Sequence, residues 1–193
     1  MGKALFIVDV QNDFTEHGAL GVAGGDEVAE RITRFLVAHA RDYEVVVASR
    51  DWHDADNDNG GHFASGEPDF IDTWPRHCVA GTPGAEYDDG FDTSAVTHHL
   101  KKGQGKPAYS LFEGVGDDGR TAAQLLEEHG IIDIDIVGLA TDYCVRASAL
   151  DAIEYGRHVR VFSDLVAGVH PDSSAKALVE IAHAGAELAE SGG

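Results

Sequence analysis

Short apolar runs alternate along the chain with longer segments in which apolar residues recur every three or four positions. The runs Lys3–Val10 and Glu44–Ser49 have the length and the aliphatic content of buried strands. Between them, the segment Glu27–Ala40 carries its apolar residues at the spacing of one helical face. These residues are Val28, Ile32, Phe35 and Leu36. The N-terminal quarter therefore predicts a strand, a helix and a second strand.

The same alternation continues in the second half of the chain. The predicted strands are His98–Lys102, Ile131–Leu139 and His158–Phe162. The predicted helices are Thr121–His129, Asp142–Tyr155 and Ser173–Ala189. Strands separated by helices need crossover connections, which place helices on both faces of a mainly parallel sheet. Because 193 residues fit one domain, we expect a single-domain, three-layer α/β/α fold of the Rossmann-like kind over residues 1–193.

One region, from residue 50 to about residue 93, contains no long periodic segment. A connection of that length without regular structure is uncommon in a compact domain unless it is functional. This one holds a carboxylate and three imidazoles, on Asp51, His53, His62 and His77. Such ligands suit Zn²⁺, Fe²⁺ or Mn²⁺, although a chain with eleven histidines also places several in one loop by chance. We expect a metal-binding loop at about residues 50–93.

Asp9 lies near the carboxyl end of the first predicted strand. Open α/β sheets place their sites at that edge of the sheet. Burial would raise the pKa of this carboxyl group and suit it to proton transfer. The competing interpretation is a residue that caps the next turn.

Cys144 follows a predicted strand and a tight turn, with Thr141 or Asp142 as the N-cap of the next helix. In the first helical turn, free N–H groups and the helix dipole favour a thiolate and can hold an oxyanion. The alternative is a buried, inert cysteine, which is the commoner fate of a free thiol.

Two adjacent lysines, Lys101 and Lys102, end the third predicted strand. An ammonium group beside Asp9 and Cys144 would stabilise both as anions. The alternative is a basic pair in contact with solvent.

The composition narrows the class of protein. A formal net charge of −20, with only 14 Lys and Arg, describes a surface that repels phosphate and argues against nucleic-acid binding. No apolar stretch approaches the length that spans a membrane. Two cysteines make no disulfide framework. We therefore expect a cytoplasmic protein without nucleic-acid or membrane partners, in which Cys78 and Cys144 are free thiols.

Seven short segments carry most of the candidate chemistry. They are residues 7–14 (IVDVQNDF), 49–53 (SRDWH), 61–63 (GHF), 74–78 (WPRHC), 81–84 (GTPG), 108–112 (AYSLF) and 138–145 (GLATDYCV). In this order they resemble the motifs of the isochorismatase-like cysteine hydrolases, and most closely those of the nicotinamidase/pyrazinamidases. Their joint occurrence over nearly the whole chain is specific, although no single motif is.

The resemblance implies a catalytic triad on Asp9, Lys102 and Cys144. Lys102 is preferred to Lys101 because it precedes Gly103 and keeps the family's distance to the segment at 108–112. The triad is the set expected for attack of a cysteine on an amide.

The resemblance also implies a cis peptide bond between Leu139 and Ala140, and an oxyanion hole formed by the N–H groups of Ala140 and Cys144. The family's substrate-binding residues fall on Phe14, Trp74, Tyr109 and Leu139. Its metal ligands fall on Asp51, His53, His62 and His77. They would hold one divalent ion, with Zn²⁺ as the first choice and Fe²⁺ or Mn²⁺ as alternatives.

The implied activity is hydrolysis of nicotinamide or pyrazinamide to the acid and ammonia through a thioester, by a metal-dependent amidase. The implied partner is a small heteroaromatic amide, and the implied state is a monomer or a small homo-oligomer. One alternative is a related enzyme with a ureido or carbamoyl substrate, or an isochorismatase, which typically lacks the metal ligands. Another is a non-catalytic metal-binding protein of the same fold. Tyr143 departs from the family, since histidine often occupies its position.

Overall fold

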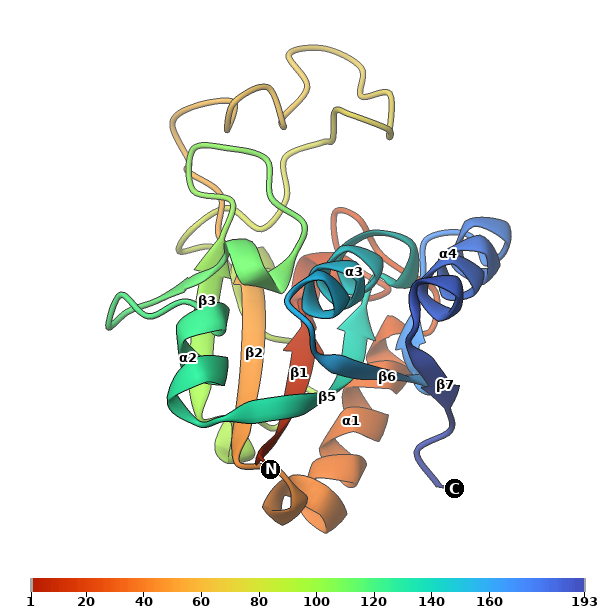
Figure 1. Ribbon diagram of the computed structural model, residues 1–193. Helices are drawn as coiled ribbons and strands as arrows, with labels where there is room; N and C mark the ends of the chain where they lie inside the picture. The colour runs from red at the N-terminus through yellow and green to blue at the C-terminus, as the bar shows by residue number, and fades with distance from the viewer. Residues whose placement is uncertain (1, 193) are drawn as a thin grey trace.

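Seven strands form one sheet in the spatial order β4-β3-β2-β1-β5-β6-β7, in a computed structural model that describes residues 2–192 (Figure 1). The strands are β1 (Gly2–Val8), β2 (Val45–Asp51), β3 (His98–Lys102), β4 (Val115–Gly116), β5 (Ile131–Leu139), β6 (His158–Ala167) and β7 (Glu187–Ala189). The α-helices are α1 (Gly25–His39), α2 (Ala122–Glu128), α3 (Arg146–Glu154) and α4 (Pro171–Ala184). A π-helical segment, η6 (Thr141–Val145), precedes α3. The 3-10 turns are η1 (Asn12–Phe14), η2 (Ala40–Asp42), η3 (Pro83–Ala85), η4 (Thr93–Ala95) and η5 (Leu111–Glu113).

The strands of the described sheet run parallel except at β3 and β4, which pair antiparallel. Apolar side chains form a core on each face, because successive residues of a strand point to opposite faces. In β1, Ala4 and Phe6 belong to the core that includes α2 and α3, whereas Leu5 and Ile7 belong to the core that includes α1 (Figure 1). The expected three-layer α/β/α fold with a mainly parallel sheet is therefore confirmed.

Most predicted elements have ends within two residues of the observed ones. The final helix is an exception, because it ends at Ala184 and not at Ala189. Gly185 follows with a φ of 117°, the left-handed conformation that often ends helices. Residues 187–189 instead form β7 against β6, which itself runs on to Ala167 and not only to Phe162. The short edge strands β4 and β7 were not predicted, since so few residues carry no periodic pattern.

The turn after β5 also differs from its expected form. The segment η6 has no side-chain cap, so the expected N-cap at Thr141 or Asp142 is wrong. The Asp142 carboxylate accepts hydrogen bonds from the N–H groups of Val169 and His170 at 3.0 and 3.3 Å, and from the Ser173 hydroxyl at 2.5 Å. A carboxylate at the start of one helix thus holds the residues that lead into the next.

The long connection between β2 and β3 is present as expected, and it extends beyond the sheet edge (Figure 1). Its described residues form only 3-10 turns and isolated bridges, such as those that join His53 to Val79 and Phe63 to Trp74. No helix within residues 2–192 combines the length and the apolar character that a membrane span requires.

Close packing of β5 on β1 generates a prediction about stability. Gly138 has a φ of 115°, and a Cβ atom there would lie 2.1 Å from the Val8 carbonyl oxygen. We expect Gly138→Ala to lower the free energy of unfolding by about 3 kcal/mol, because the two strands would have to separate. Gly66→Ala is the control, with nothing within 4 Å and an expected change below about 0.5 kcal/mol. Urea denaturation measures both, and equal midpoints would contradict this packing.

Candidate active site

Four polar side chains lie at the ends of neighbouring strands. Asp9 follows β1, Asp51 ends β2, Lys102 ends β3, and Cys144 lies in the turn after β5. Because these strands run parallel, their carboxyl ends meet at one edge of the sheet, where open α/β sheets place their sites. All four side chains are buried, with exposed fractions of 6% or less. The structure therefore brings together residues that are far apart in sequence.

The ammonium group of Lys102 is the centre of this cluster. Its Nζ lies 2.9 Å from Asp9 Oδ2, contacts Asp51 Oδ1, and lies 3.6 Å from Cys144 Sγ. Burial alone would lower the pKa of Lys102, but Asp51 and Asp9 raise it well above its usual range. The group therefore stays positively charged among its three partners.

The neighbouring Lys101 points the other way, because side chains alternate along β3. Its Nζ lies 2.9 Å from an oxygen of Asp117 and 4.9 Å from the centroid of the Trp52 ring. Of the two adjacent lysines, only Lys102 reaches the cluster.

Asp9 has a left-handed backbone, with a φ of 48°, and no exposed surface. Its Oδ1 accepts a hydrogen bond from the Ser49 hydroxyl at 2.6 Å. Burial raises the pKa of the Asp9 carboxyl group in spite of the Lys102 ammonium, and the charge of Asp51 adds to the rise. A carboxyl group with a raised pKa is suited to take up a proton and return it.

The thiol of Cys144 lies against these carboxylates. One oxygen each of Asp9 and Asp51 lies within 4.8 Å of the sulfur. Burial raises the pKa of Cys144 well above its usual range, and Lys102 only partly counteracts this. Burial and the two neighbouring carboxylates thus act against the stabilisation of a thiolate that was expected from the helix end. Such a nucleophile needs a base, and Asp9 is adjacent.

The turn between β5 and Cys144 contains a cis peptide bond between Leu139 and Ala140, as predicted. The Ala140 carbonyl accepts hydrogen bonds from the N–H groups of Tyr143 and Val145, each at 3.1 Å. The Cys144 N–H takes part in neither bond, and Ala140 and Cys144 both line the cavity. The predicted contact of Leu139 with a substrate does not hold for its side chain, which is buried in the α1 core and does not line the cavity.

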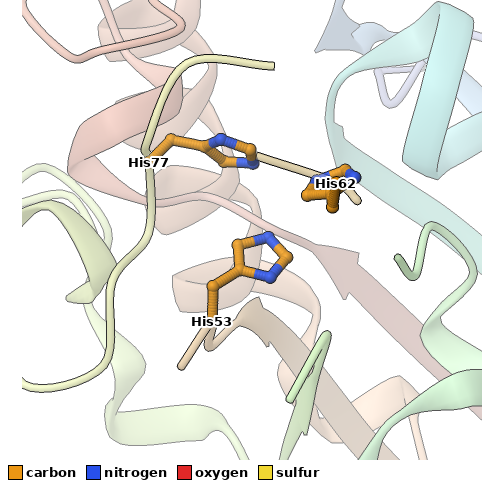
Figure 2. Close-up of side chains that lie close together, drawn as sticks. All are labelled: His53, His62 and His77. Carbon is orange, nitrogen blue, oxygen red and sulfur yellow. The ribbon is translucent and has the colours of Figure 1, made fainter. Parts of the chain in front are cut away.

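Three histidines from the long loop lie close together, as Figure 2 shows, and two of them lie within 4 Å of Asp51. One ring nitrogen from each of His53, His62 and His77 lies within 4.8 Å of the other two. His53 Nδ1 lies 2.9 Å from the Gly103 carbonyl oxygen, and His77 Nδ1 lies 2.8 Å from that of Pro75. Backbone carbonyls hold ligand histidines in this way, with the second nitrogen directed at the metal.

The nitrogens that face the centre of this group suit a cation. His53 Nε2 and both nitrogens of His62 are buried without a hydrogen-bond partner among the described residues. Burial lowers the pKa of His62 and of His77 to about 4, so both rings are neutral and can donate a lone pair. Asp51 Oδ2 lies 3.6 Å from His53 Nε2 and 3.9 Å from His77 Nε2. Three imidazoles and a carboxylate fit Zn²⁺, Fe²⁺ or Mn²⁺.

A cavity of about 470 Å³ opens in front of Cys144. Phe14, Trp74 and Tyr109, which the sequence indicated as substrate-binding residues, all line it. Trp74 Nε1 donates a hydrogen bond to the Tyr109 hydroxyl at 3.1 Å, which fixes two of the walls relative to each other. The cavity therefore has aromatic walls close to the thiol and the histidines.

Half of the cavity lining was not predicted. The additional residues are Ala19, Leu20, Gly21, Val22, Phe70, Tyr143, Val169 and His170. Only Tyr143 carried a signal in the sequence, because it lies next to Cys144 and departs from the family pattern. The others lie on loops whose position depends on the folded chain.

Gln11 is a further residue that sequence reasoning passed over. Its side chain is buried and makes two hydrogen bonds to the backbone of Asp51: Oε1 accepts from the N–H at 2.8 Å, and Nε2 donates to the carbonyl at 2.9 Å. A third bond joins Nε2 to the Ala85 carbonyl at 2.9 Å. Gln11 thus positions Asp51 relative to β1. Gln11 could have been identified from the sequence, because it lies within the motif of residues 7–14.

Comparison with known proteins gives concordant results. A family model described as Isochorismatase domain matches residues 3–192. The nicotinamidase/pyrazinamidase of Mycobacterium tuberculosis is 48% identical over 186 residues, which cover 96% of this chain and 97% of that protein. The structure of the pyrazinamidase of Pyrococcus horikoshii in complex with zinc has a TM-score of 0.82 at 36% identity, and the match covers 98% of this chain and 99% of that one.

A second solved structure, PnC1 from L. infantum in complex with nicotinate, has a TM-score of 0.84 at 31% identity, covering 99% of this chain and 93% of that one. Sequence and structural similarity thus agree over nearly the full length. The chain belongs to the isochorismatase family, among its nicotinamidase/pyrazinamidase members.

Proposed function

We propose that this chain hydrolyses nicotinamide and pyrazinamide to the corresponding acid and ammonia, with Cys144 as the nucleophile. The observation that carries the proposal is the meeting of two clusters at one cavity. Asp9 and Lys102 lie behind the thiol at its base, and three histidines lie at its side. The aromatic walls between them suit a planar heteroaromatic ring.

The first half of the proposed reaction forms a thioester. Asp9 takes the proton of the Cys144 thiol as the sulfur attacks the carboxamide carbon, while Lys102 stabilises the charge that moves between them. The N–H groups of Ala140 and Cys144 donate to the oxygen of the tetrahedral intermediate. Asp9 then gives the proton to the leaving nitrogen. The C–N bond breaks, ammonia departs, and the acyl group remains on sulfur.

The second half of the reaction uses the same carboxylate. Asp9 takes a proton from a water molecule that attacks the thioester carbon, and the C–S bond breaks. The sulfur recovers the proton through Asp9, and the carboxylic acid leaves the cavity. The raised pKa of Asp9 supports this role, since the group must hold a proton between steps.

The loop of residues 50–93 would hold one divalent metal ion through Asp51, His53, His62 and His77, with Zn²⁺ as the first choice. Bound there, the ion would supply a coordination position for the ring nitrogen of the substrate. Phe14, Trp74 and Tyr109 enclose the ring. The metal ligands and the aromatic residues thus orient the substrate, whereas Asp9, Lys102 and Cys144 carry out the attack on the carbonyl carbon. The proposed partner is the small heteroaromatic amide alone, and the protein is a monomer or a small homo-oligomer.

The two alternatives from the sequence are less well supported. A ureido or carbamoyl substrate would place open-chain polar groups against walls that are mostly apolar. A non-catalytic metal-binding protein would have no need of a lysine buried with two carboxylates and a thiol, because buried ions cost free energy unless they are paired.

The two cysteines provide a direct test of the nucleophile. We expect Cys144→Ala to lower the rate of ammonia release from nicotinamide by about 10³-fold or more, since no other group can form the thioester. Cys78→Ala is the control, because Cys78 is also buried but does not line the cavity. It is expected to keep most of the activity. Retained turnover in Cys144→Ala would rule out the mechanism.

The two adjacent lysines allow the fully buried ammonium group to be compared with a partly exposed one. We expect Lys102→Ala to lower kcat by at least about 10²-fold, because Asp9 and Asp51 lose the cation between them. Lys101→Ala removes a surface ion pair with Asp117 and is expected to change kcat by less than about threefold. Steady-state kinetics of both variants decides the matter. If Lys101→Ala loses more activity than Lys102→Ala, the assignment of the catalytic role to Lys102 is wrong.

Removal of the metal is expected to separate binding from nucleophile chemistry. Because misplacing reacting atoms by about 1 Å costs on the order of 10²-fold in rate, chelation or His53→Ala should collapse turnover of nicotinamide. Alkylation of Cys144 by iodoacetamide should change by less than about threefold, since Asp9 and Lys102 still contact the thiol. The alkylation rate is measured by mass spectrometry before and after chelation. A parallel fall in both rates would show that the metal supports the nucleophile itself.

A further inference from the structure

The cavity is larger than the proposed reaction requires. At about 470 Å³ it lies within the range of about 300–1,000 Å³ that holds drug-sized ligands, whereas nicotinamide is a single ring with one carboxamide. The chemistry uses only the deep end of the cavity, where Cys144, Asp51, His62 and His77 are at most 6% exposed. The rest of the volume has no assigned occupant.

The remaining part, here called the outer chamber, is lined by Ala19, Leu20, Val22, Phe70, Val169 and His170. Phe70 and Val169 are 53% and 37% exposed, which places them toward solvent relative to the buried thiol. His170 is the one member of this set with a polar side chain. The outer chamber is therefore an apolar extension of the cavity and not a second polar site.

One wall of the outer chamber is held by backbone hydrogen bonds. The N–H of Leu20 donates to the Asp13 carbonyl at 2.8 Å, and the N–H of Val22 donates to the Phe14 carbonyl at 3.1 Å. Phe14 also lines the deep end. The position of this wall is thus tied to the wall that faces the proposed substrate ring.

The opposite wall is held by the nucleophile turn. The Asp142 carboxylate accepts hydrogen bonds from the N–H groups of Val169 and His170. Gly168 leaves no room for a side chain, because a Cβ atom there would lie 2.0 Å from Ser174 Oγ. Since both walls are already fixed, a ligand group that enters the outer chamber need not order them first.

We propose that the preferred substrates include primary heteroaromatic carboxamides that carry an alkyl substituent on the ring, with the alkyl group in the outer chamber. This inference rests on the proposed amidase function and extends its substrate class. Burial of one methylene group strengthens binding by about fourfold. The alkyl group contacts the protein equally in the ground state and the transition state, so the gain is expected in KM and not in kcat.

The test is a substrate series with the metal-loaded protein. Nicotinamides with a methyl, ethyl or propyl group at each free ring carbon are compared with nicotinamide by ammonia release. For one ring position, we expect KM to fall by about fourfold for each added carbon while kcat stays within about threefold. If every alkylated amide has a kcat/KM more than tenfold below that of nicotinamide, the proposal is overturned.

A matched pair of variants locates the effect. Val169→Trp fills the outer chamber and is expected to lower the kcat/KM of the best propyl substrate, relative to that of nicotinamide, by about tenfold or more. Val179→Trp is the control, because Val179 is 54% exposed on α4 and does not line the cavity. Val169→Ala retains the preference for the propyl substrate. An unchanged ratio in a folded Val169→Trp protein would overturn the assignment to the outer chamber.

The same experiments distinguish failure of the proposed amidase function from failure of the inference about the outer chamber. If alkylated amides are hydrolysed and nicotinamide is not, the proposed substrate is wrong and the outer chamber stands. If no amide is hydrolysed, the proposed function fails, and binding is read from quenching of the protein's tryptophan fluorescence by the same compounds, since Trp74 lines the cavity. Affinity that does not increase with alkyl length in that assay overturns the inference as well.

Discussion

The arrangement of the whole site depends on one buried cation, the ammonium group of Lys102. A charge without exposed surface would cost several kcal/mol if it were isolated. Asp9, Asp51 and Cys144 surround it, and each comes from the end of a different strand. A parallel sheet is the structure that brings these ends to one edge. The buried ammonium group can therefore be paired only if these strands lie side by side with their carboxyl ends at one edge of the sheet.

Asp51 connects this cluster to the group of histidines. One of its carboxylate oxygens contacts Lys102, and the other lies 3.6 Å from His53 Nε2. Its backbone N–H and carbonyl are both bonded to the side chain of Gln11, which lies just after β1. A single residue thus belongs to both polar groups.

Sequence reasoning identified the deep part of the site and not its mouth. Asp9, Cys144 and the pair Lys101 and Lys102 were found because they end recognisable strands or begin a helix, and the resemblance to the family then selected Lys102. Val169 and the segment 19–22 lie on loops without periodic pattern, and hydrogen bonds to residues outside these loops determine their positions. The same reason explains the two helix ends that were predicted wrongly, the C-terminal end of α4 and the N-cap after β5. Helix propensity is a local property, and it does not show which residue elsewhere in the folded chain a helix-end residue will bond to.

The sequence by itself determined the order of strands and helices, the parallel character of the sheet and the family motifs, because hydrophobic periodicity and short motifs are local properties. Only the tertiary structure decided which of two adjacent lysines is buried, that Asp142 binds the segment before α4, and that burial raises the pKa of the Cys144 thiol. These features depend on distances between groups remote in sequence. Burial and Coulomb interactions depend on which groups lie close together in the folded chain, and the order of residues along the sequence does not specify this.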